Sequence, residues 1–213
     1  MLVRSDDGYE AAGIWAMQRA LIETGYTVTM VAPKRQQSWS GKSLFDHSPI
    51  THKTITVKDQ LVHVLDATPA ACTRIGLHNI LENPPLFVVS GVNHGGNDGI
   101  HYMMSSGTLG AALEASFDGI RSLAVSLAHA LNYRADDSNV NNAFAQAASV
   151  AADLIKKLEH YTFPPDIDAL NINVPYDIKD RTIAVCKHNR DRNVTGQLKM
   201  LIHIIYTQKA ARP

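Results

Sequence analysis

Short apolar runs alternate with amphipathic stretches along most of the chain, and this alternation constrains the fold more than any other feature. Apolar, β-branched runs typical of strands occupy residues 1–3, 26–32, 86–89, 122–127 and 170–174. Patterns typical of helices lie at residues 12–24, 68–81, 107–117 and 141–160. Strands that alternate with helices build a mostly parallel sheet with helices on both faces. The sequence therefore predicts an α/β fold, a three-layer sandwich with a mostly parallel sheet.

Two further segments are expected to add strands. Residues 54–57 and 61–65 are apolar and β-branched and are separated by Lys58, Asp59 and Gln60, which predicts a hairpin. Residues 200–206 (MLIHIIY) predict one more strand in a short C-terminal extension. That strand would either close an edge of the sheet or pair with a second subunit.

Composition excludes several classes of protein. With 213 residues, 45% of them hydrophobic, the chain is expected to form one domain, or one domain with a small appendage. Twenty basic and twenty acidic residues argue against a protein built on attraction to nucleic acid or to an anionic membrane. No apolar run approaches the roughly 18 residues of a membrane span, and the N-terminal residues do not resemble a signal peptide. Two cysteines, Cys72 and Cys186, suggest neither a disulfide framework nor a zinc site, so we expect a cytoplasmic protein.

Two adjacent carboxylates, Asp6 and Asp7, follow the first predicted strand and precede Gly8. In an open α/β sheet, ligands bind outside the carboxyl ends of the strands, where these acids are expected to lie. A glycine turn would allow both side chains to face one centre, and paired carboxylates suit a hard cation such as Mg²⁺ or Mn²⁺. An ordinary surface turn is the alternative interpretation of the same residues.

Two other polar loops are expected at the same edge of the sheet. Residues 34–43 offer serine hydroxyls, and residues 90–99 offer two asparagines within a run that is too rich in glycine for a helix or a strand. Hydroxyl and carboxamide oxygens complete a ligand set for a hard cation. Ser106, Gly107 and Thr108 begin the next predicted helix, and backbone N–H groups at such a start favour phosphate. A cation next to a phosphate site suggests phosphoester chemistry.

Two common nucleotide-binding motifs are absent from the sequence. The spacing of Gly95, Gly96 and Gly99 does not make a dinucleotide fingerprint, which places its glycines between the first strand and the first helix. The run Gly41-Lys42-Ser43 ends like a Walker loop but lacks the upstream glycine. Phosphate binding is therefore expected to use a different arrangement.

Six blocks of sequence together resemble the SurE (survival protein E) family. They occur in the family's order and with similar spacing, and they read SDDG, VAPKRQQSWSGKS, ATPAAC, VVSGVNHGGNDG, SSGT and LNINVP. The resemblance implies a Rossmann-like sheet and a metal-dependent 5'-nucleotidase, a phosphatase that hydrolyses nucleoside monophosphates. It also implies one Mn²⁺ or Mg²⁺ per subunit, a homodimer or homotetramer, and no role for nucleic acid polymers or membranes.

The resemblance also implies site residues, position by position. The metal ligands fall on Asp6, Asp7, Ser38 and Asn93. Of these, Asp6 and Asp7 are the candidate catalytic residues, and Asp6 would orient or deprotonate the attacking water. The segments beside the substrate phosphate supply Asn93, Gly95, Asn97, Ser106, Gly107 and Thr108.

Three side chains near these motifs carry two interpretations each. His94 would contact phosphate or face solvent without a role, and Trp39 would stack on a base or pack over its loop. Glu114 would orient the site or lie on a solvated helix face, and the solvated face is the simpler expectation.

The chain departs from the family pattern at a few positions. Arg4 and Ser5 replace a Thr-Asn pair, and Ala71 replaces an aspartate. Residues 179–213 lack the family's final Gly-Tyr-Val-Ser type segment. We therefore expect a catalytic domain over residues 1–175 and an extension over residues 176–213 that serves as a shortened oligomerisation or edge-strand segment. A nucleotide-binding paralogue with weak or lost catalysis, or a scaffold that uses the tail, are the alternative functions.

Overall fold

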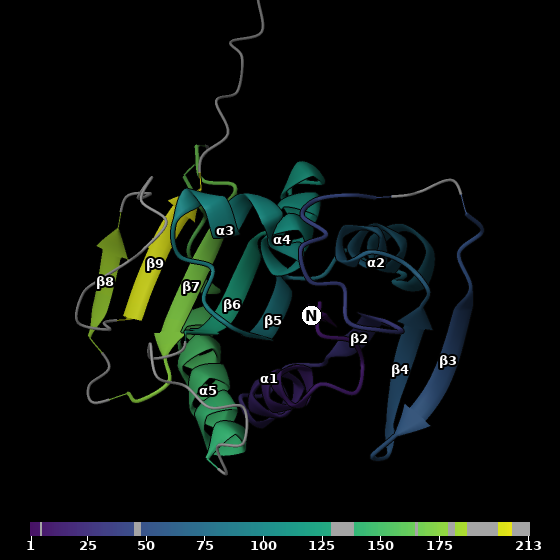
Figure 1. The fold of residues 1–213 in the computed structure, drawn as a ribbon, viewed down its shortest axis with the longest axis horizontal. Coiled ribbons are helices and arrows are strands. Elements are labelled where there is room, and N and C mark those ends of the chain that lie inside the picture. The colour runs from purple at the N-terminus through teal and green to yellow at the C-terminus, as the bar shows by residue number, and fades with distance from the viewer. Residues whose placement is uncertain are drawn as a thin grey trace, which may run out of the picture.

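The computed structural model describes residues 1–4, 6–44, 48–128, 139–164, 166–178, 182–186 and 200–205, with only the backbone described at residues 4, 186 and 200–205. The strands of this part of the chain form one sheet of nine, in the order β3-β4-β2-β1-β5-β6-β7-β9-β8 (Figure 1). Their bounds are β1 Leu2–Arg4, β2 Thr29–Pro33, β3 His52–Val57, β4 Gln60–Leu65, β5 Val88–His94, β6 Ser122–Ala128, β7 Ala169–Pro175, β8 Ile183–Cys186 and β9 Met200–Ile205.

The centre of the sheet is parallel. Strands β4, β2, β1, β5, β6 and β7 all run in one direction, while β3 pairs antiparallel with β4 and β9 pairs antiparallel with β7. The residues of β6 and β7 are buried throughout, which is typical of parallel strands covered on both faces. The predicted mostly parallel sheet is confirmed.

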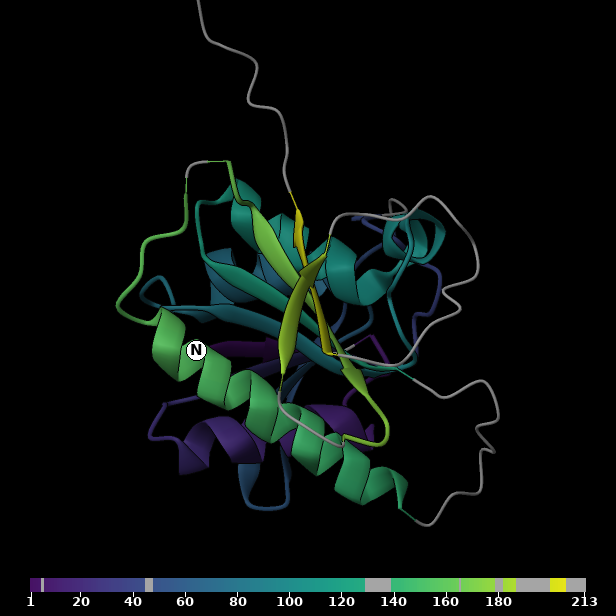
Figure 2. The same cartoon turned by 90° about the vertical axis from the view of Figure 1, so that its left-hand side faces the viewer.

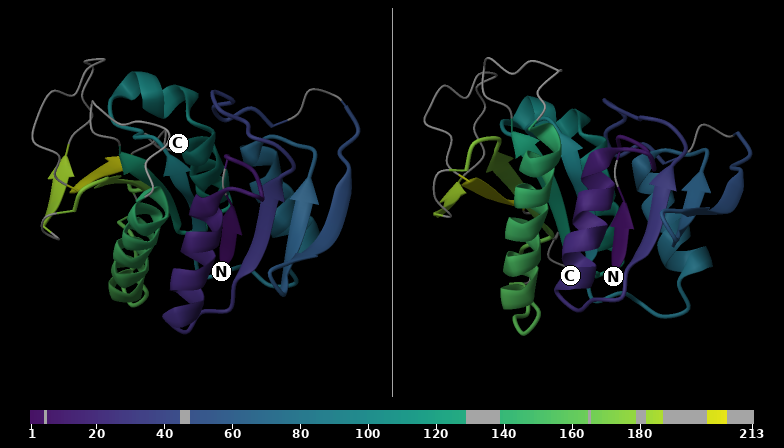
Figure 3. Two further views of the ribbon diagram at one scale, coloured as in Figure 1. Left: turned by 60° about the horizontal axis from the view of Figure 1, so that its bottom comes forward. Right: turned by 90° about the horizontal axis from the view of Figure 1, so that it is seen from below.

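Helices cover both faces of the sheet. On one face α1 (Ala12–Glu23) packs beside α5 (Val140–Leu158), as Figures 2 and 3 show. On the other face α2 (Pro69–Ile75), continued by the single π-helical turn η1 (Gly76–Ile80), packs beside α4 (Gly107–Phe117). A short helix, α3 (Ile100–Ser105), precedes α4. The predicted three-layer sandwich is therefore confirmed.

The helices form where their sequences provide an apolar side or a cap. In α1, Ile14, Met17 and Leu21 are fully buried at helical spacing against the sheet. The start of α2 is fixed by Thr68, whose hydroxyl accepts a hydrogen bond from Ala71 N at 3.2 Å, and by Pro69 in the first turn. These signals place the helices as the sequence predicts.

Lys58 and Asp59 form the turn of the β3–β4 hairpin. Both have positive φ, 50° and 58°, and Val57 pairs with Gln60, so two residues connect the strands. Positive φ at both central positions is the geometry of the type I′ turn, whose twist matches that of the strands. The predicted hairpin is confirmed.

The structure corrects the expectation that residues 90–99 form neither helix nor strand. β5 continues through Ser90 to His94, with an irregularity in its pairing with β6 between Ser90 and Asn93. Gly91 has φ 137°, and a Cβ there would lie 2.2 Å from Val125 O. Glycine at this position therefore allows two strand backbones to approach closely, rather than marking a loop.

The C-terminal strands join the same sheet. β9 occupies the edge of β7, and β8 lies beyond it (Figure 1). This arrangement agrees with the interpretation in which the tail closes the edge of the sheet. Residues 179–181, 187–199 and 206–213 lie outside the described residues, and the division into residues 1–175 and 176–213 stays a prediction. None of the helices in the described ranges is long and apolar enough to cross a membrane.

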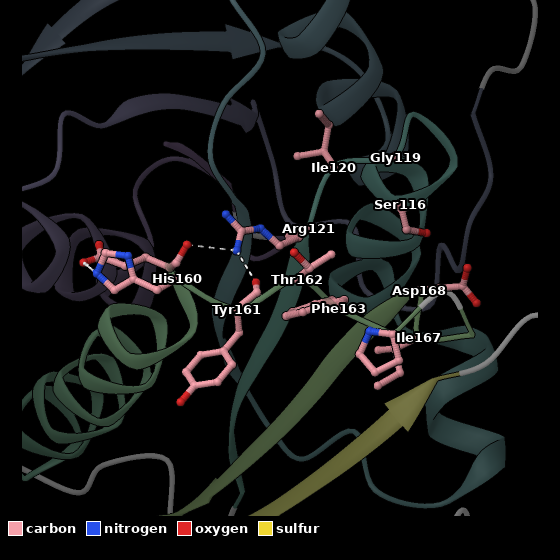
Figure 4. Close-up of a pocket in the computed structure, with 12 residues that line it drawn as sticks. Ser116, Gly119, Ile120, Arg121, His160, Tyr161, Thr162, Phe163, Ile167 and Asp168 are labelled. Carbon is pink, nitrogen blue, oxygen red and sulfur yellow. Dashed lines mark hydrogen bonds and ion pairs between the residues drawn. The ribbon is translucent and has the colours of Figure 1, made fainter.

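A cavity of about 460 Å³ lies beside the end of α5 and the start of β6. Arg121 is at its centre (Figure 4), and its Nη1 donates to Tyr161 O at 2.7 Å, Leu158 O at 3.0 Å and Glu159 O at 3.3 Å. The guanidinium also lies 4.2 Å from the centroid of the Phe87 ring. Carbonyls at the C-terminal end of a helix have no partner within the helix, so Arg121 caps α5.

Replacing Arg121 with alanine is expected to destabilise the protein by about 2 kcal/mol, because hydrogen bonds to charged groups contribute about 1.5–3 kcal/mol. For a chain of this size, the melting temperature should fall by roughly 4–8 °C in a thermal scan. Arg121→Lys keeps the positive charge but lacks the planar guanidinium with its several donors. Its melting temperature should therefore lie between those of the wild type and of Arg121→Ala. An unchanged melting temperature in Arg121→Ala would contradict this role.

Candidate functional site

Three polar segments meet at the carboxyl edge of the parallel strands. Gln37 N, in the loop after β2, donates to Asp6 O at 2.7 Å, and Gly41 N in the same loop donates to Ser105 O at 2.9 Å. Between these segments lies a pocket of about 210 Å³. It is lined by Asp6, Ser38, Trp39, Asn93, His94, Gly95, Gly96, Asn97, Tyr102, Ser105 and Ser106. The predicted convergence of the three segments is present in the fold.

Asp6 is held at the back of this pocket. Its side chain is 4% exposed, and its Oδ1 accepts a hydrogen bond from Thr108 Oγ1 at 2.5 Å. Among the side chains that the structure describes, none with a positive charge forms an ion pair with Asp6. A buried carboxylate without a neighbouring cation is costly, so this position favours a cation in the pocket.

Asp7 and Ser38 are linked through one side chain. Gln36 Nε2 donates to Asp7 Oδ1 at 3.3 Å and to Ser38 Oγ at 3.0 Å. The other oxygen of Asp7 accepts from His94 N at 3.0 Å. Two of the expected metal ligands therefore face one amide nitrogen, which occupies a position between their oxygens.

The glycine-rich segment after β5 is anchored by buried asparagines. Asn97 N donates to Asn173 Oδ1 at 2.7 Å, and Asn97 O accepts from Asn171 Nδ2 at 2.8 Å. Asn97 Nδ2 donates to Ser126 Oγ at 2.8 Å. Asn97 is 6% exposed. Its side-chain nitrogen and backbone are thus committed to holding the segment in place at the pocket wall.

Asn93 lies at the pocket wall with its nitrogen engaged. Its Nδ2 donates to Gly95 O at 2.6 Å. The amide oxygen is the atom that suits a cation, and the second N–H of the same amide can donate to a phosphoryl group. The arrangement is therefore compatible with both roles expected for Asn93.

The start of α4 abuts Asp6. Ser106 is the N-cap, and its hydroxyl accepts from Leu109 N at 3.1 Å. A Cβ on Gly107 would lie 2.7 Å from Ser40 Oγ and 3.1 Å from Asp6 Cβ. The first N–H groups of a helix have no partner within it, so those of Gly107 and Thr108 suit an anion beside Asp6.

The loop of residues 34–44 is fastened to α4. A Cβ on Gly110 would lie 2.2 Å from Gly41 O, so loop and helix touch through their backbones. Glu114 is 3% exposed and forms ion pairs with Lys42 and, at 3.2 Å, with Arg74. The expectation of a solvated helix face is wrong for Glu114. Its neighbours in the sequence are small or apolar and do not indicate that two cations from other segments would form ion pairs with this carboxylate.

Glu114→Gln is expected to lower stability by about 1–2 kcal/mol. The amide keeps the shape of the side chain but leaves Lys42 and Arg74 without their shared counter-charge. Both cations are partly exposed, so the loss should be smaller than for a fully buried pair. Chemical denaturation checks this, and Glu23→Gln, at an exposed position at the end of α1, provides a matched carboxylate control away from the loop. Equal stability of the Glu114 variant and the wild type would contradict the role of Glu114.

Two other side chains with open interpretations lie at the pocket. Trp39 is 66% exposed. The ring of His94 lies 5.4 Å from that of Phe144, and partial burial lowers the pKa of His94 below its usual value. A neutral imidazole at the pocket is therefore favoured near pH 7.

The structure describes only some of the positions at which the chain departs from the family pattern. The backbone of Arg4 ends β1, whereas its side chain and all of Ser5 lie outside the described residues. Ala71 is fully buried in the first turn of α2. An aspartate there would have to find a partner in that buried position.

The donor chemistry fits a hard cation. Within the described ranges, no group of three or more His, Cys, Asp or Glu side chains could hold a metal ion. Carboxylate oxygens of Asp6 and Asp7, the hydroxyl of Ser38 and the amide oxygen of Asn93 are hard donors, which suit Mg²⁺ or Mn²⁺ rather than a softer metal. The buried Asp6 carboxylate, which forms no ion pair with any side chain in the described ranges, supports the same ion.

Sequence reasoning missed several residues that support the site. Thr108 was expected beside phosphate, but its hydroxyl holds Asp6. Gln36 gave no signal of its own. Asn171 and Asn173 did give one, because two asparagines at alternate positions of an otherwise apolar strand place polar groups on one buried face.

Comparison with known proteins agrees with this architecture. The family model described as "Survival protein SurE" matches residues 1–195. The 5'-nucleotidase SurE of Geobacter sulfurreducens is 43% identical over 180 residues, which cover 82% of this chain and 62% of that protein. The 5'-nucleotidase SurE of a Nostoc species is 35% identical over 181 residues, covering 82% of this chain and 63% of that protein. This chain thus spans less than two thirds of the length of these relatives.

A solved structure supports the same relationship. The crystal structure of the SurE protein from Aquifex aeolicus superposes with a TM-score of 0.74 at 31% identity, covering 96% of this chain and 81% of that chain. Because 96% of this chain is covered, the similarity extends past residue 175. The chain has a three-layer α/β fold and convergent loops, and the family model matches residues 1–195. It therefore belongs to the survival protein SurE family.

Proposed function

We propose that this protein is a metal-dependent phosphatase that hydrolyses nucleoside monophosphates to nucleoside and phosphate. The observation that carries the proposal is the meeting of Asp6, Ser38 and Asn93, from three different strand ends, in one pocket at the start of α4. The relatives named 5'-nucleotidase SurE support a nucleotide as the substrate.

Asp6, Asp7, Ser38 and Asn93 would hold one Mn²⁺ or Mg²⁺. When bound, such an ion polarises phosphoryl oxygens and lowers the pKa of a coordinated water. Asp6 orients the attacking water and accepts its proton, since it lines the pocket and Thr108 holds its carboxylate in place. Water adds to phosphorus, the P–O bond to the nucleoside breaks, the departing oxygen takes a proton from solvent, and Asp6 releases the proton of the attacking water to solvent.

The start of α4 binds the phosphate. The N–H groups of Gly107 and Thr108 supply donors and the positive end of the helix dipole. Gly95 and Asn97 shape the opposite wall, where the buried asparagines keep the segment rigid. Fixed donors of this kind stabilise charge on a transferring phosphoryl group without reorganisation.

The test is phosphate release from AMP and GMP by the purified protein with added Mn²⁺ or Mg²⁺. Activity should require the ion, should stop in excess chelator, and should return when the ion is restored. Titration calorimetry with Mn²⁺ alone should show one site per chain, lost in Asp7→Asn. Hydrolysis that persists in excess chelator would overturn the metal-dependent mechanism.

A nucleotide-binding paralogue with weak catalysis is the second candidate. The observation that favours it is Gln36, whose amide nitrogen lies between Asp7 and Ser38, where a cation would have to displace it. Calorimetry separates the two candidates, because the paralogue binds AMP without releasing phosphate. Gln36→Ala should then increase the affinity for Mn²⁺.

A further inference from the structure

Three aromatic side chains form a surface at the rim of the pocket. Trp39 comes from the loop after β2, and His101 and Tyr102 come from α3. We call these three residues the rim platform. Trp39 is 66% and Tyr102 40% exposed, and both line the pocket that holds Asp6 and Asn93. Exposed apolar side chains that gather in one patch beside a pocket are typical of a binding site.

The rings of the rim platform support one another. The Trp39 centroid lies 6.0 Å from that of Tyr102, with the planes at 43°, and 6.3 Å from that of His101. These separations are those of aromatic rings in direct contact, about 4.5–7 Å. A further ring therefore does not fit between Trp39 and Tyr102. The indole of Trp39 thus contacts both aromatic rings of α3 and still remains 66% exposed.

The backbone of Trp39 is strained. Its φ is 65°, a left-handed conformation that costs a non-glycine residue about 1–3 kcal/mol. The loop holds it there through the hydrogen bonds of Gln37 N to Asp6 O and of Gly41 N to Ser105 O. Packing does not account for this conformation, because the side chain is mostly exposed. Strain that is retained beside a pocket points to a role in binding.

The size of the pocket indicates which part of a ligand reaches the rim platform. Its volume of about 210 Å³ is below the roughly 300–1,000 Å³ of pockets that enclose a whole drug-sized ligand. A nucleotide whose phosphate lies against the start of α4 must therefore leave its base at the rim.

We propose that the rim platform is a nucleobase subsite, in which the base of the substrate stacks on the exposed face of Trp39. This rests on the proposed function, whose phosphate site it extends. Stacking on an aromatic face contributes about 1–3 kcal/mol per base and is tolerant of base identity. The platform thus favours nucleotides over other phosphate monoesters, with only a modest preference for purines, whose rings are larger.

The first test compares AMP with ribose 5-phosphate, which lacks the base. Trp39→Ala should lower kcat/KM for AMP by about 5- to 150-fold. The ratio of kcat/KM for AMP to that for ribose 5-phosphate should fall by nearly the same factor. Trp39→Phe retains a ring and should recover part of the loss. Tyr161→Ala is the matched control, since Tyr161 is 67% exposed and lines the cavity around Arg121 instead.

The second test measures binding without hydrolysis. The chain has two tryptophans, and Trp15 is 6% exposed, so a stacking ligand should quench mainly Trp39. Adenosine, which carries no phosphate, should quench the fluorescence of the wild type, whereas ribose should not, and Trp39→Phe should abolish the quenching.

The outcomes separate the two proposals. Phosphate release from AMP and ribose 5-phosphate with an unchanged ratio in Trp39→Ala, and no quenching by adenosine, would overturn the nucleobase subsite and leave the phosphatase intact. Quenching by adenosine together with no phosphate release from any monoester would support the subsite and overturn the phosphatase.

Discussion

Asp6→Asn is expected to lower the rate of phosphate release from AMP by about 10³-fold or more. The variant removes the negative charge that would bind the cation and the base that would accept the proton of water, and each such effect contributes about 10²–10⁴-fold. The amide oxygen of asparagine can still accept the hydrogen bond from Thr108, so the fold should be retained. Activity at saturating Mn²⁺, together with circular dichroism, checks both statements.

Asp59→Asn is the matched control for this variant. Asp59 lies in the type I′ turn of the β3–β4 hairpin, where asparagine is equally suited to positive φ. It should change neither activity nor melting temperature. If Asp6→Asn kept more than a tenth of the wild-type activity, Asp6 would be neither an essential ligand nor the base, and the proposed mechanism would be wrong.

Gly13→Ala is expected to have a large effect on stability. A Cβ on Gly13 would lie 1.9 Å from Val92 O and 3.2 Å from Phe144 Cε1, so α1 would have to move away from β5. Overpacking of this kind costs about 1–3 kcal/mol, and a backbone contact that cannot rotate away places the loss near the upper end. A decrease of roughly 6–12 °C in melting temperature follows.

The Gly13 variant should also impair the site, since Val92 precedes Asn93 and the displacement would reach the pocket wall. Helix propensity works in the opposite direction, because alanine is favoured over glycine by about 1 kcal/mol. Gly119→Ala serves as the comparison. Gly119 has φ 75° with no atom within 4 Å of the added Cβ, so alanine there should introduce local backbone strain but no steric clash. A Gly13 variant as stable as the wild type would show that α1 and β5 can separate without loss.

The order of strands and helices was predictable because each element carries its own local signal. Each of these signals lies within one short segment of the sequence. Examples are the apolar runs of β6 and β7, the periodicity of α1 and the Thr68-Pro69 start of α2. The continuation of β5 from Ser90 to His94 was not predictable in this way, because a run with glycine and asparagine is typical of a loop. Gly91 is needed for the approach of β5 to β6, a contact between residues more than thirty positions apart.

The candidate site also has a part that was predictable from the sequence and a part that was not. Asp6, Ser38 and Asn93 could be predicted to converge because parallel strands present their carboxyl ends at one edge. The partners that hold them could not. Thr108 reaches Asp6 across 102 positions, and Lys42 reaches Glu114 across 72. Local patterns contain no information about such pairs.

By itself, the sequence determined the class of fold, the edge of the sheet where the polar loops gather and the chemistry of their donors. These follow from hydrophobic periodicity and from the residue types at strand ends, which act over short distances along the chain. Only the tertiary structure decided that Thr108 fixes Asp6, that Asn171 and Asn173 anchor the segment of Asn97, and that Trp39 stands exposed at the rim. Hydrogen bonds and burial depend on which atoms meet after the layers have packed, and packing joins residues that are distant in sequence.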